Sequence, residues 1–383
     1  MAENMMENRT KYDAVIIGFG KGGKTMAGAL GAAGKKVALI EKSDRMYGGT
    51  CINVGCIPTK SLVYRAGLAA AKGGSFEEKA AAYKAAMEQK EDLTTRLRGK
   101  NYQKLDSNPN ITVIDGTASF QSPHVVEVEK DGKTFQVEGE QIFINTGSSA
   151  FIPPIEGLKG NPYVYTSEGL LNLTELPSRL VIIGGGYIGV EFSSIYASFG
   201  SEVTILQDGD VFLPREDAEI AGEVKKSLEA RGVRVLTGVK TKAVRQGQGK
   251  AIVDLDNGKE VQKLEAEAVL VATGRRPNTA GLNLEAAGVE IGPRGGIVTD
   301  DSLTTTAPHI YAMGDVRGGL QFTYIALDDF RIVKSKVLGD GSYTLKERGA
   351  VPYSVFLIPP FSRVGLSEKE AVEKGDKGKV GRL

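Results

Sequence analysis

The chain has 383 residues, of which 41% are hydrophobic, and its 48 lysines and arginines nearly balance its 47 aspartates and glutamates. This length predicts two or three domains with a substantial core, and the near-neutral charge offers no electrostatic case for nucleic acid or an anionic membrane. Residues 1–11 are polar, without the apolar stretch of a signal peptide, and no later run approaches the length that spans a bilayer. We therefore expect a cytoplasmic protein.

The first ordered segment, residues 11–42, predicts a buried strand at 14–17, a glycine-rich turn, a helix and a second strand that ends at Glu41. The turn carries three glycines in GxGxxG spacing: Gly18, Gly20 and Gly23. Such glycines permit a tight turn, close approach of a pyrophosphate to the backbone and close packing of helix on strand. The helix start then faces the phosphate charge, and Glu41 stands where a carboxylate accepts hydrogen bonds from a ribose.

Both cysteines of the chain, Cys51 and Cys56, lie in the next segment, GGTCINVGCIPTK, residues 48–60. In a regular helix, residues five apart have Cα atoms roughly 8.6 Å apart, beyond the limit of about 7 Å for a disulfide. Gly55 and Pro58 allow the chain to leave regular helix, because glycine relaxes the backbone limits and proline removes an amide donor. The sequence of this segment therefore permits a strained, reducible disulfide between its two cysteines.

Two other interpretations of the cysteine pair stay open at this point. Two cysteines in a cytoplasmic protein are often small buried hydrophobic side chains. A structural zinc site would need His124 and His309 as further ligands, and neither has helpful spacing, so we expect no metal site. If a disulfide does form in the cytoplasm, it is more often catalytic or redox-sensing than structural.

The middle of the chain predicts a repeat of the first unit. Residues 76–105 predict a long helix, and residues 111–139 and 233–264 show short β-like runs with turn signals, which predict hairpins. The segment from residue 178 to Gln207 again reads as strand, glycine turn, helix and strand, with Gln207 at the position of Glu41. Its glycines are Gly184, Gly186 and Gly189. Two dinucleotide sites are implied.

Two apolar strands that end in Thr-Gly, at 141–149 and 267–278, extend the repeat. Together with the two GxGxxG units, the CxxxxC after the first of them and IYAMGDV at 310–316, they resemble the flavin-dependent pyridine nucleotide-disulfide oxidoreductases. That family includes glutathione reductase, dihydrolipoamide dehydrogenase and mercuric reductase. The stretches KYDAVIIGFGKGGKTMA, MYGGTCINVGCIPTKSLV, GGLQFTYIALDDFRIV and VPYSVFLIPPFSRVGLSE are most similar to the bacterial subgroup that resists reactive chlorine species and hypothiocyanous acid.

The resemblance implies an α/β fold with two dinucleotide-binding, Rossmann-like domains and an incomplete C-terminal interface domain. We expect an FAD-binding domain in two parts, 11–150 and 273–345, an NAD(P)-binding domain at 151–272 and the start of the interface domain at 350–383. The first glycine turn and Glu41 would then bind FAD, with Asp315 at its ribityl chain, and the second turn with Gln207 would bind NADH or NADPH. The other cofactor-binding residues implied are Lys42, Gly49, Thr50, Lys60, Thr146, Gly147 and Gly274.

The resemblance also assigns roles in catalysis. Cys51 and Cys56 would be the redox disulfide, with Cys56 the proximal thiol against the flavin and Cys51 the distal thiol that meets substrate. A helix start near Cys56, with Lys60 one turn on, would lower the pKa of the Cys56 thiol. Lys60 would lie near the flavin N5 and pair with Glu191. Electrons would pass from NADH or NADPH through FAD to the disulfide and on to a small-molecule oxidant.

The chain departs from the family pattern at its end. Members normally continue after a VGLSE-like segment into an interface domain that forms the homodimer and, in many, supplies a His-Glu acid-base pair. This chain stops at Leu383, about twenty residues beyond its VGLSE, and neither histidine stands where it could replace that base. We therefore expect a truncated form, whose dimer is in question.

Three hypotheses follow. The first is an enzyme whose oxidant is hypothiocyanous acid, a reactive chlorine product, a disulfide or a metal ion. The second is a truncated FAD-binding fragment without turnover. The third keeps the fold and takes dihydrolipoamide or mercuric ion as substrate. Gln207 replaces the acidic residue of a strict NAD site, so the preference between the two nicotinamides stays open.

Overall fold

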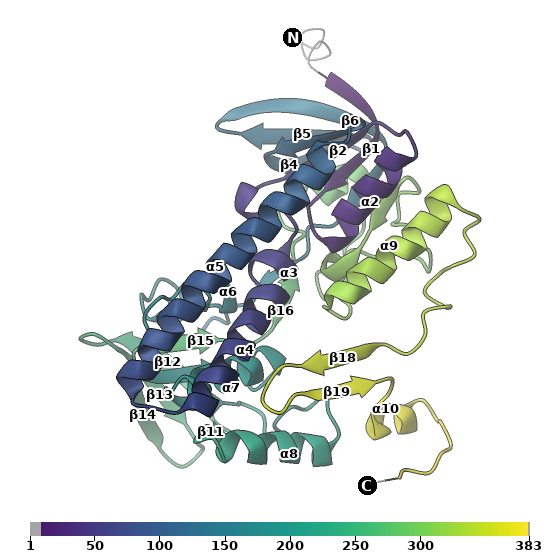
Figure 1. The fold of residues 1–383 in the computed structure, drawn as a ribbon. Coiled ribbons are helices and arrows are strands. Elements are labelled where there is room, and N and C mark those ends of the chain that lie inside the picture. The colour runs from purple at the N-terminus through teal and green to yellow at the C-terminus, as the bar shows by residue number, and fades with distance from the viewer. Residues whose placement is uncertain (1–8, 382–383) are drawn as a thin grey trace. The chain divides into compact units, whose positions relative to one another are not determined.

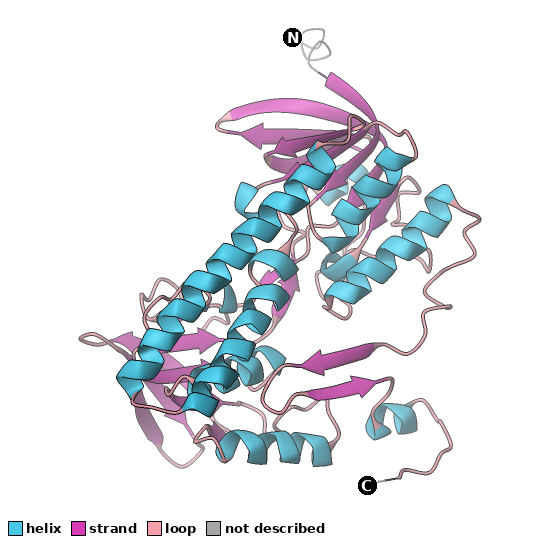
Figure 2. Ribbon diagram, viewed as in Figure 1, coloured by secondary structure: helices cyan, strands magenta, loops and turns pink. Residues whose placement is uncertain are grey.

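The structure is a computed structural model and describes residues 9–381 (Figures 1 and 2). Contacts divide it into two compact units. The first unit contains the chain up to Ile57, Asp92–Ser149 and Arg275–Arg348, and the second contains Pro58–Glu91, Ala150–Gly274 and the chain from Gly349 onward. The domain limits expected from the family remain a prediction.

The first unit is built on a parallel sheet with helices on one face. Its elements are β1 (Arg9–Ile17), α2 (Lys21–Ala32), β2 (Val37–Glu41), η1 (Asp44–Met46), α3 (Thr50–Asn53), β3 (Ile111–Asp115), β4 (Thr117–Ser122), β5 (Val125–Lys130), β6 (Lys133–Ile144), β7 (Ser148–Ala150), β16 (Arg275–Pro277), η2 (Leu284–Ala287), β17 (Ile310–Ala312), η3 (Gly314–Arg317) and α9 (Thr323–Leu338).

The parallel strands of this unit run in the order β3-β2-β1-β6-β17. Side chains alternate between the two faces of a strand. Ala14 and Ile16 of β1 therefore belong to a core shared with α2 and α9, whereas Val15 and Ile17 belong to a core on the opposite face. That second face is covered by the antiparallel strands β4 and β5 and the first half of β6. Because both faces are covered, β2 is buried along its whole length.

The second unit repeats this plan. Its elements are β8 (Val164–Tyr165), α6 (Ser167–Leu170), β9 (Arg179–Ile183), α7 (Tyr187–Ser198), β10 (Glu202–Leu206), α8 (Ala218–Glu229), β11 (Arg234–Leu236), β12 (Lys240–Gln246), β13 (Ala251–Asp256), β14 (Val261–Ala266), β15 (Ala268–Val271), β18 (Pro352–Val355), β19 (Phe361–Val364) and α10 (Glu368–Glu373). The helices α4 (Cys56–Lys72) and α5 (Phe76–Asp106) pass from one unit to the other along the chain.

The sheet of the second unit runs β11-β10-β9-β15-β8, all parallel. Leu180 and Ile182 of β9 face a core shared with α7 and α8, whereas Val181 and Ile183 face the antiparallel sheet β12-β13-β14. The α/β class with two Rossmann-like units is therefore confirmed. The predicted long helix at 76–105 is confirmed by α5.

One part of the sequence prediction was wrong in both units. Residues 111–115 and 234–236 do not form hairpin strands; β3 pairs in parallel with β2, and β11 pairs in parallel with β10. Each follows a helix that returns the chain to the same end of the sheet, and such a crossover produces parallel neighbours. The antiparallel hairpins begin after these strands, and the turn at Asp131-Gly132 joins β5 to β6.

The glycines at the two turns are required by close backbone approach. Gly18 has φ +103° and Gly184 has φ +112°, values that residues with a Cβ rarely adopt. A Cβ on Gly18 would overlap the carbonyl of Asn145, and one on Gly184 would overlap the carbonyl of Ala272. The strand that returns to the centre of each sheet therefore passes directly against the turn, as GxGxxG in a strand-turn-helix unit predicts.

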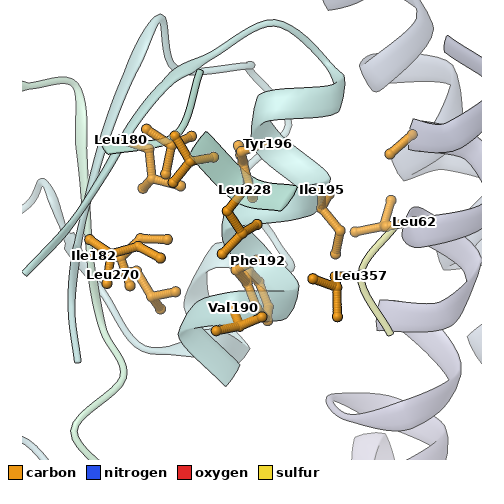
Figure 3. Close-up of a cluster of buried hydrophobic side chains, with 14 of the residues drawn as sticks. Leu62, Leu180, Ile182, Val190, Phe192, Ile195, Tyr196, Leu228, Leu270 and Leu357 are labelled. Atoms are coloured by element: carbon orange, nitrogen blue, oxygen red, sulfur yellow. The ribbon is translucent and has the colours of Figure 1, made fainter. Parts of the chain in front are cut away.

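The largest buried cluster of the second unit joins the sheet to the helices that cover it (Figure 3). The side chains labelled there are Leu62, Leu180, Ile182, Val190, Phe192, Ile195, Tyr196, Leu228, Leu270 and Leu357. Leu62 belongs to α4 and Leu357 follows β18, so segments distant in sequence complete this core.

We predict that Leu228→Ala lowers the free energy of unfolding by roughly 2–5 kcal/mol, because it leaves a cavity in this core. Leu228 is fully buried on α8, while Ile220 on the same helix is 45% exposed. Ile220→Ala is the matched control and should change stability by no more than about 0.5 kcal/mol. Urea unfolding followed by circular dichroism measures both; equal losses would contradict the assigned core.

Candidate active site

The first glycine turn is held by Asn145, which the sequence analysis did not single out. Asn145 Oδ1 accepts a hydrogen bond from the Gly23 N–H at 2.8 Å, and its Nδ2 donates to the Met313 carbonyl at 2.7 Å. One buried amide therefore joins the start of α2 to the strand end at β17. The signal in the sequence is its place directly before Thr146-Gly147, at the end of the predicted strand.

Glu41 lies at the end of β2 and faces the same turn. Its Oε2 accepts a hydrogen bond from the Phe19 N–H at 3.0 Å, and its Oε1 accepts one from the Ser43 N–H at 3.3 Å. Burial raises the pKa of the Glu41 carboxyl, and these two backbone donors partly oppose that rise. Lys42 beside it is exposed to solvent.

Gln207 occupies the equivalent place in the second unit. Its Oε1 accepts a hydrogen bond from the Gly185 N–H at 2.9 Å, as Glu41 does from Phe19 in the first unit. Its Nε2 donates to Asp208 Oδ1 at 3.2 Å. The amide therefore keeps the strand-to-turn link that a carboxylate makes in the first unit, without adding a charge.

Asp315 lies in the first unit beside the second half of the Thr-Gly loop. Its Oδ2 accepts a hydrogen bond from Ser148 Oγ at 2.7 Å, and Arg275 Nε donates to the same hydroxyl at 2.9 Å. Burial raises the pKa of the Asp315 carboxyl, while Ser148 and then Arg275 act in the opposite direction. Thr146 is fixed nearby by hydrogen bonds exchanged with Asn278.

The cysteine segment is not a regular helix. Cys51 lies in α3, which begins after Gly49 and ends at Asn53, and Cys56 is the first residue of α4. The break falls at residues 54–55, where a Cβ on Gly55 would lie 2.9 Å from the Thr50 carbonyl oxygen. The predicted departure from regular helix is therefore confirmed, and both cysteine side chains are half-buried.

Two contacts place the cysteine segment within the first unit. A Cβ on Gly49 would lie 2.6 Å from the Cα of Gly20, so this segment packs directly on the first glycine turn. Cys56 Sγ lies 3.3 Å from the hydroxyl of Thr323, the first residue of α9. Thr323 was not foreseen from the sequence, because it is 267 residues away from Cys56.

Lys60 and Glu191 both contact Phe356 in the second unit. The ammonium of Lys60 lies 4.2 Å from the centre of the Phe356 ring, and the Phe356 N–H donates to Glu191 Oε1 at 2.8 Å. Phe356 follows β18, in the segment VPYSVFLIPP that carried part of the resemblance. The two predicted residues thus contact the same residue, Lys60 through its ring and Glu191 through its backbone N–H.

The site residues expected from the sequence fall into two groups. The first unit holds Gly18, Gly20, Gly23, Glu41, Lys42, Gly49, Thr50, Cys51, Cys56, Thr146, Gly147 and Asp315. The second unit holds Lys60, Gly184, Gly186, Gly189, Glu191, Gln207 and Gly274.

The two histidines stack on each other in the first unit, with ring centroids 3.9 Å apart, and each directs a ring nitrogen to a backbone carbonyl. Within residues 9–381, no three His, Cys, Asp or Glu side chains gather in a way that suits a metal ion. Over the same residues, no helix has the length and apolar character needed to cross a membrane.

Comparison with known proteins identifies the class. The chain matches the family model described as pyridine nucleotide-disulphide oxidoreductase over residues 12–329. It belongs to that family and is therefore an FAD-dependent oxidoreductase. Family members use FAD and NAD(P)H and act on small molecules, typically as homodimers.

Its relatives narrow the class further. The chain is 48% identical over 365 residues to the probable pyridine nucleotide-disulfide oxidoreductase RclA of Escherichia coli K12, covering 95% of this chain and 79% of that protein. It is 38% identical over 377 residues to a mercuric reductase of Staphylococcus aureus, covering 95% of this chain and 66% of that one. A dihydrolipoamide dehydrogenase of Chaetomium thermophilum is 35% identical over 381 residues, covering 96% and 74%.

The fold comparison agrees. The Cu(II) complex of the HOCl-induced flavoprotein disulfide reductase RclA from Escherichia coli superimposes with a TM-score of 0.88 at 48% identity, covering 96% of this chain and 80% of that one. The protein is therefore a flavoprotein disulfide oxidoreductase related to RclA, mercuric reductase and dihydrolipoamide dehydrogenase.

We predict that Glu41→Gln makes the flavin-free protein more stable relative to wild type as pH rises. Burial raises the pKa of Glu41 in the native state, so the unfolded chain releases this proton first and wild type loses stability above about pH 4.3. The amide keeps one acceptor and has no charge to desolvate. The stability of Glu41→Gln relative to wild type should therefore increase between pH 4 and pH 7.

Urea unfolding of the flavin-free protein at several pH values measures this gain. The same substitution at the exposed Glu285 is the control and should leave the pH dependence unchanged. A stability difference between Glu41→Gln and wild type that stays constant with pH would contradict the role assigned to burial.

Proposed function

We propose that this protein passes electrons from NADH or NADPH through FAD to the pair Cys51–Cys56 and on to a small oxidant. The oxidants considered are hypothiocyanous acid, a reactive chlorine product, a disulfide and a metal ion. The observation that carries the proposal is the position of Cys56, at the start of α4, with its sulfur 3.3 Å from the hydroxyl of Thr323 at the start of α9.

The residues of the first unit fit FAD. The glycine turn leaves no room for side chains where the start of α2 meets the neighbouring backbone, which is what a pyrophosphate site requires. Glu41 and Asp315 are carboxylates held in place at the turn and at the Thr-Gly loop, suited to the adenosine ribose and the ribityl chain. When bound, the flavin supplies the two-electron link between nicotinamide and disulfide. We assign Lys42, Gly49, Thr50, Thr146 and Gly147 to the same cofactor site.

The second unit fits a nicotinamide dinucleotide at Gly184, Gly186 and Gly189. Gln207 carries no negative charge, so it does not repel a 2′-phosphate and still offers hydrogen bonds to a ribose hydroxyl. We therefore propose that NADH and NADPH are both accepted, with Gly274 lining the same site. Lys60 and Glu191, which both contact Phe356 in this unit, are the further catalytic residues of the proposal.

The thiols divide their work by position. Cys56 is the first residue of α4, which has 17 residues, and it contacts Thr323, the first residue of α9, which has 16. The partial positive charge at the N-termini of these two helices favours the Cys56 thiolate. The Thr323 hydroxyl can donate to that thiolate. Cys51 lies in the separate short helix α3. We assign it the attack on substrate, which it would make as the thiolate, the reactive form of a cysteine.

An electrophilic oxidant is favoured over a dithiol substrate. The relative with 48% identity is named an HOCl-induced flavoprotein disulfide reductase, whereas the mercuric reductase of Staphylococcus aureus is 38% identical and the dihydrolipoamide dehydrogenase 35% identical. Attack of a thiolate on an electrophilic oxidant also needs less help from a proton donor than dithiol exchange does. We further propose a cytoplasmic location and the family's homodimer.

Anaerobic titration with NADPH and then NADH, followed by visible absorption, tests the function. We expect partial bleaching of the flavin and a long-wavelength band from a thiolate against it after two electrons. Cys56→Ser should keep the flavin and lose the band. Cys51→Ser should keep flavin reduction by nicotinamide and lose oxidant turnover. A Cys56→Ser protein that retains the band, or a Cys51→Ser protein with unimpaired turnover, would refute these assignments.

We also predict that Thr323→Val lowers the fraction of Cys56 thiolate at neutral pH by roughly tenfold, because a hydrogen bond to a charged group is lost. The pH at which the long-wavelength band appears should rise by about one unit. Thr323→Ser keeps the hydroxyl and is the matched control. If the valine and serine variants have the same pH midpoint as wild type, Thr323 does not act on the thiolate.

A further inference from the structure

Lys24 is a cation that the proposed electron path does not use. It lies on α2, directly after the last glycine of the first turn, and its side chain is half-buried. Its Nζ donates to Asn101 Oδ1 of α5 at 2.6 Å and to the Gly48 carbonyl at 3.4 Å. Asn101 is itself oriented by its Nδ2, which donates to the Leu97 carbonyl at 2.8 Å. The ammonium is therefore held at one place.

The ammonium lies at the N-terminal end of α3, the helix that carries Cys51. Gly48 precedes Gly49, the N-cap residue directly before α3, and Cys51 is the second residue of that helix. The far end of α3 is fixed as well, because Asn53 Nδ2 donates to the carbonyls of Tyr47 and Gly49 at 3.0 Å. Arg98 of α5 donates to Asn53 Oδ1 at 2.8 Å. The distal thiol thus lies on a short segment held near two cations.

Electrostatics couples Lys24 to this thiol. Burial, then Lys21, lowers the pKa of Lys24 to about 8, while the negative charge of Cys51 acts to raise it, and Lys104 of α5 adds a further small lowering. An interaction in which a thiolate favours an ammonium is reciprocal, so the ammonium favours the thiolate to the same degree. The helix α9, which also packs on α2, directs its buried carboxylate Asp329 to other groups: the Gly314 N–H, Arg317 and Arg348.

We propose that Lys24 is a positioning residue. Its ammonium, held between α5 and the N-terminal end of α3, stabilises the thiolate of Cys51 and so sets the pH at which this thiol becomes reactive. The inference rests on the proposed function for Cys51 as the thiol that meets substrate. The step is a simple ionisation: the Cys51 sulfur keeps the electron pair of its S–H bond, and the proton goes to water.

Alkylation of Cys51 tests this directly. The chain has only two cysteines, so in a Cys56→Ser background iodoacetamide reports on Cys51 alone. Rates are measured by mass spectrometry from pH 6 to pH 10 on the FAD-loaded protein. Adding Lys24→Met should slow alkylation at pH 7 about tenfold, and the profiles of the two proteins should converge at high pH, where Cys51 is ionised in both. Lys24→Arg keeps the charge and should restore most of the rate.

Lys104→Met is the matched control, because it removes the same charge from an exposed position on α5 and should change the rate at pH 7 by less than about twofold. Asn101→Leu gives a second test if Lys24→Met does not fold: it keeps the charge but removes its anchor, and should slow alkylation by an intermediate amount. The proposal would be overturned if the folded Lys24→Met or Asn101→Leu protein had the same pH profile of alkylation as the Cys56→Ser parent. It would also be overturned if Lys104→Met slowed alkylation as much as Lys24→Met does.

The result of the alkylation test can be distinguished from a failure of the proposed function. Alkylation requires no electron transfer, so a protein that fails the nicotinamide titration can still show the Lys24 effect. Conversely, normal reduction of the cysteine pair with a Lys24-independent alkylation profile would leave the proposed function intact and reject this inference.

Discussion

The backbone approach at Gly18 is the constraint on which the first unit depends. The carbonyl of Asn145 passes so close to this residue that no side chain fits between them, and the Asn145 side chain then reaches across to Gly23 and Met313. This contact aligns the start of α2 with the ends of three parallel strands. The cysteine segment packs on the same turn, through Gly49 against Gly20.

The same constraint operates in the second unit, at Gly184 and Ala272, but the surroundings differ in charge. Glu41 is a buried carboxylate whose ionisation costs stability, whereas Gln207 makes the equivalent backbone hydrogen bond as a neutral amide. A shared backbone geometry therefore supports two sites of different electrostatic character. We propose that this difference in charge bears on which ribose or phosphate group each site accepts; it does not change how either unit folds.

The environment of the thiols follows from helix placement. Cys56 lies at the start of α4 and contacts the start of α9, while Cys51 lies on a separate short helix next to Lys24. We propose that both arrangements favour negatively charged sulfur by different means: helix starts and a hydroxyl for Cys56, and the half-buried ammonium of Lys24 for Cys51. Because the break at residues 54–55 separates the two helices, each thiol has surroundings of its own.

The sequence by itself determined the fold class, the repeated strand-turn-helix units and the positions of the cysteine pair, because each depends on local patterns: glycine spacing, strand periodicity and residue order. It did not distinguish the parallel strands β3 and β11 from hairpin strands, since a short apolar run does not reveal its neighbour. It also did not reveal Asn145, Thr323, Phe356 or the role of Lys24. Their partners lie far along the chain, 122 residues away for Asn145 and Gly23 and 267 for Thr323 and Cys56, and only tertiary packing brings such pairs together.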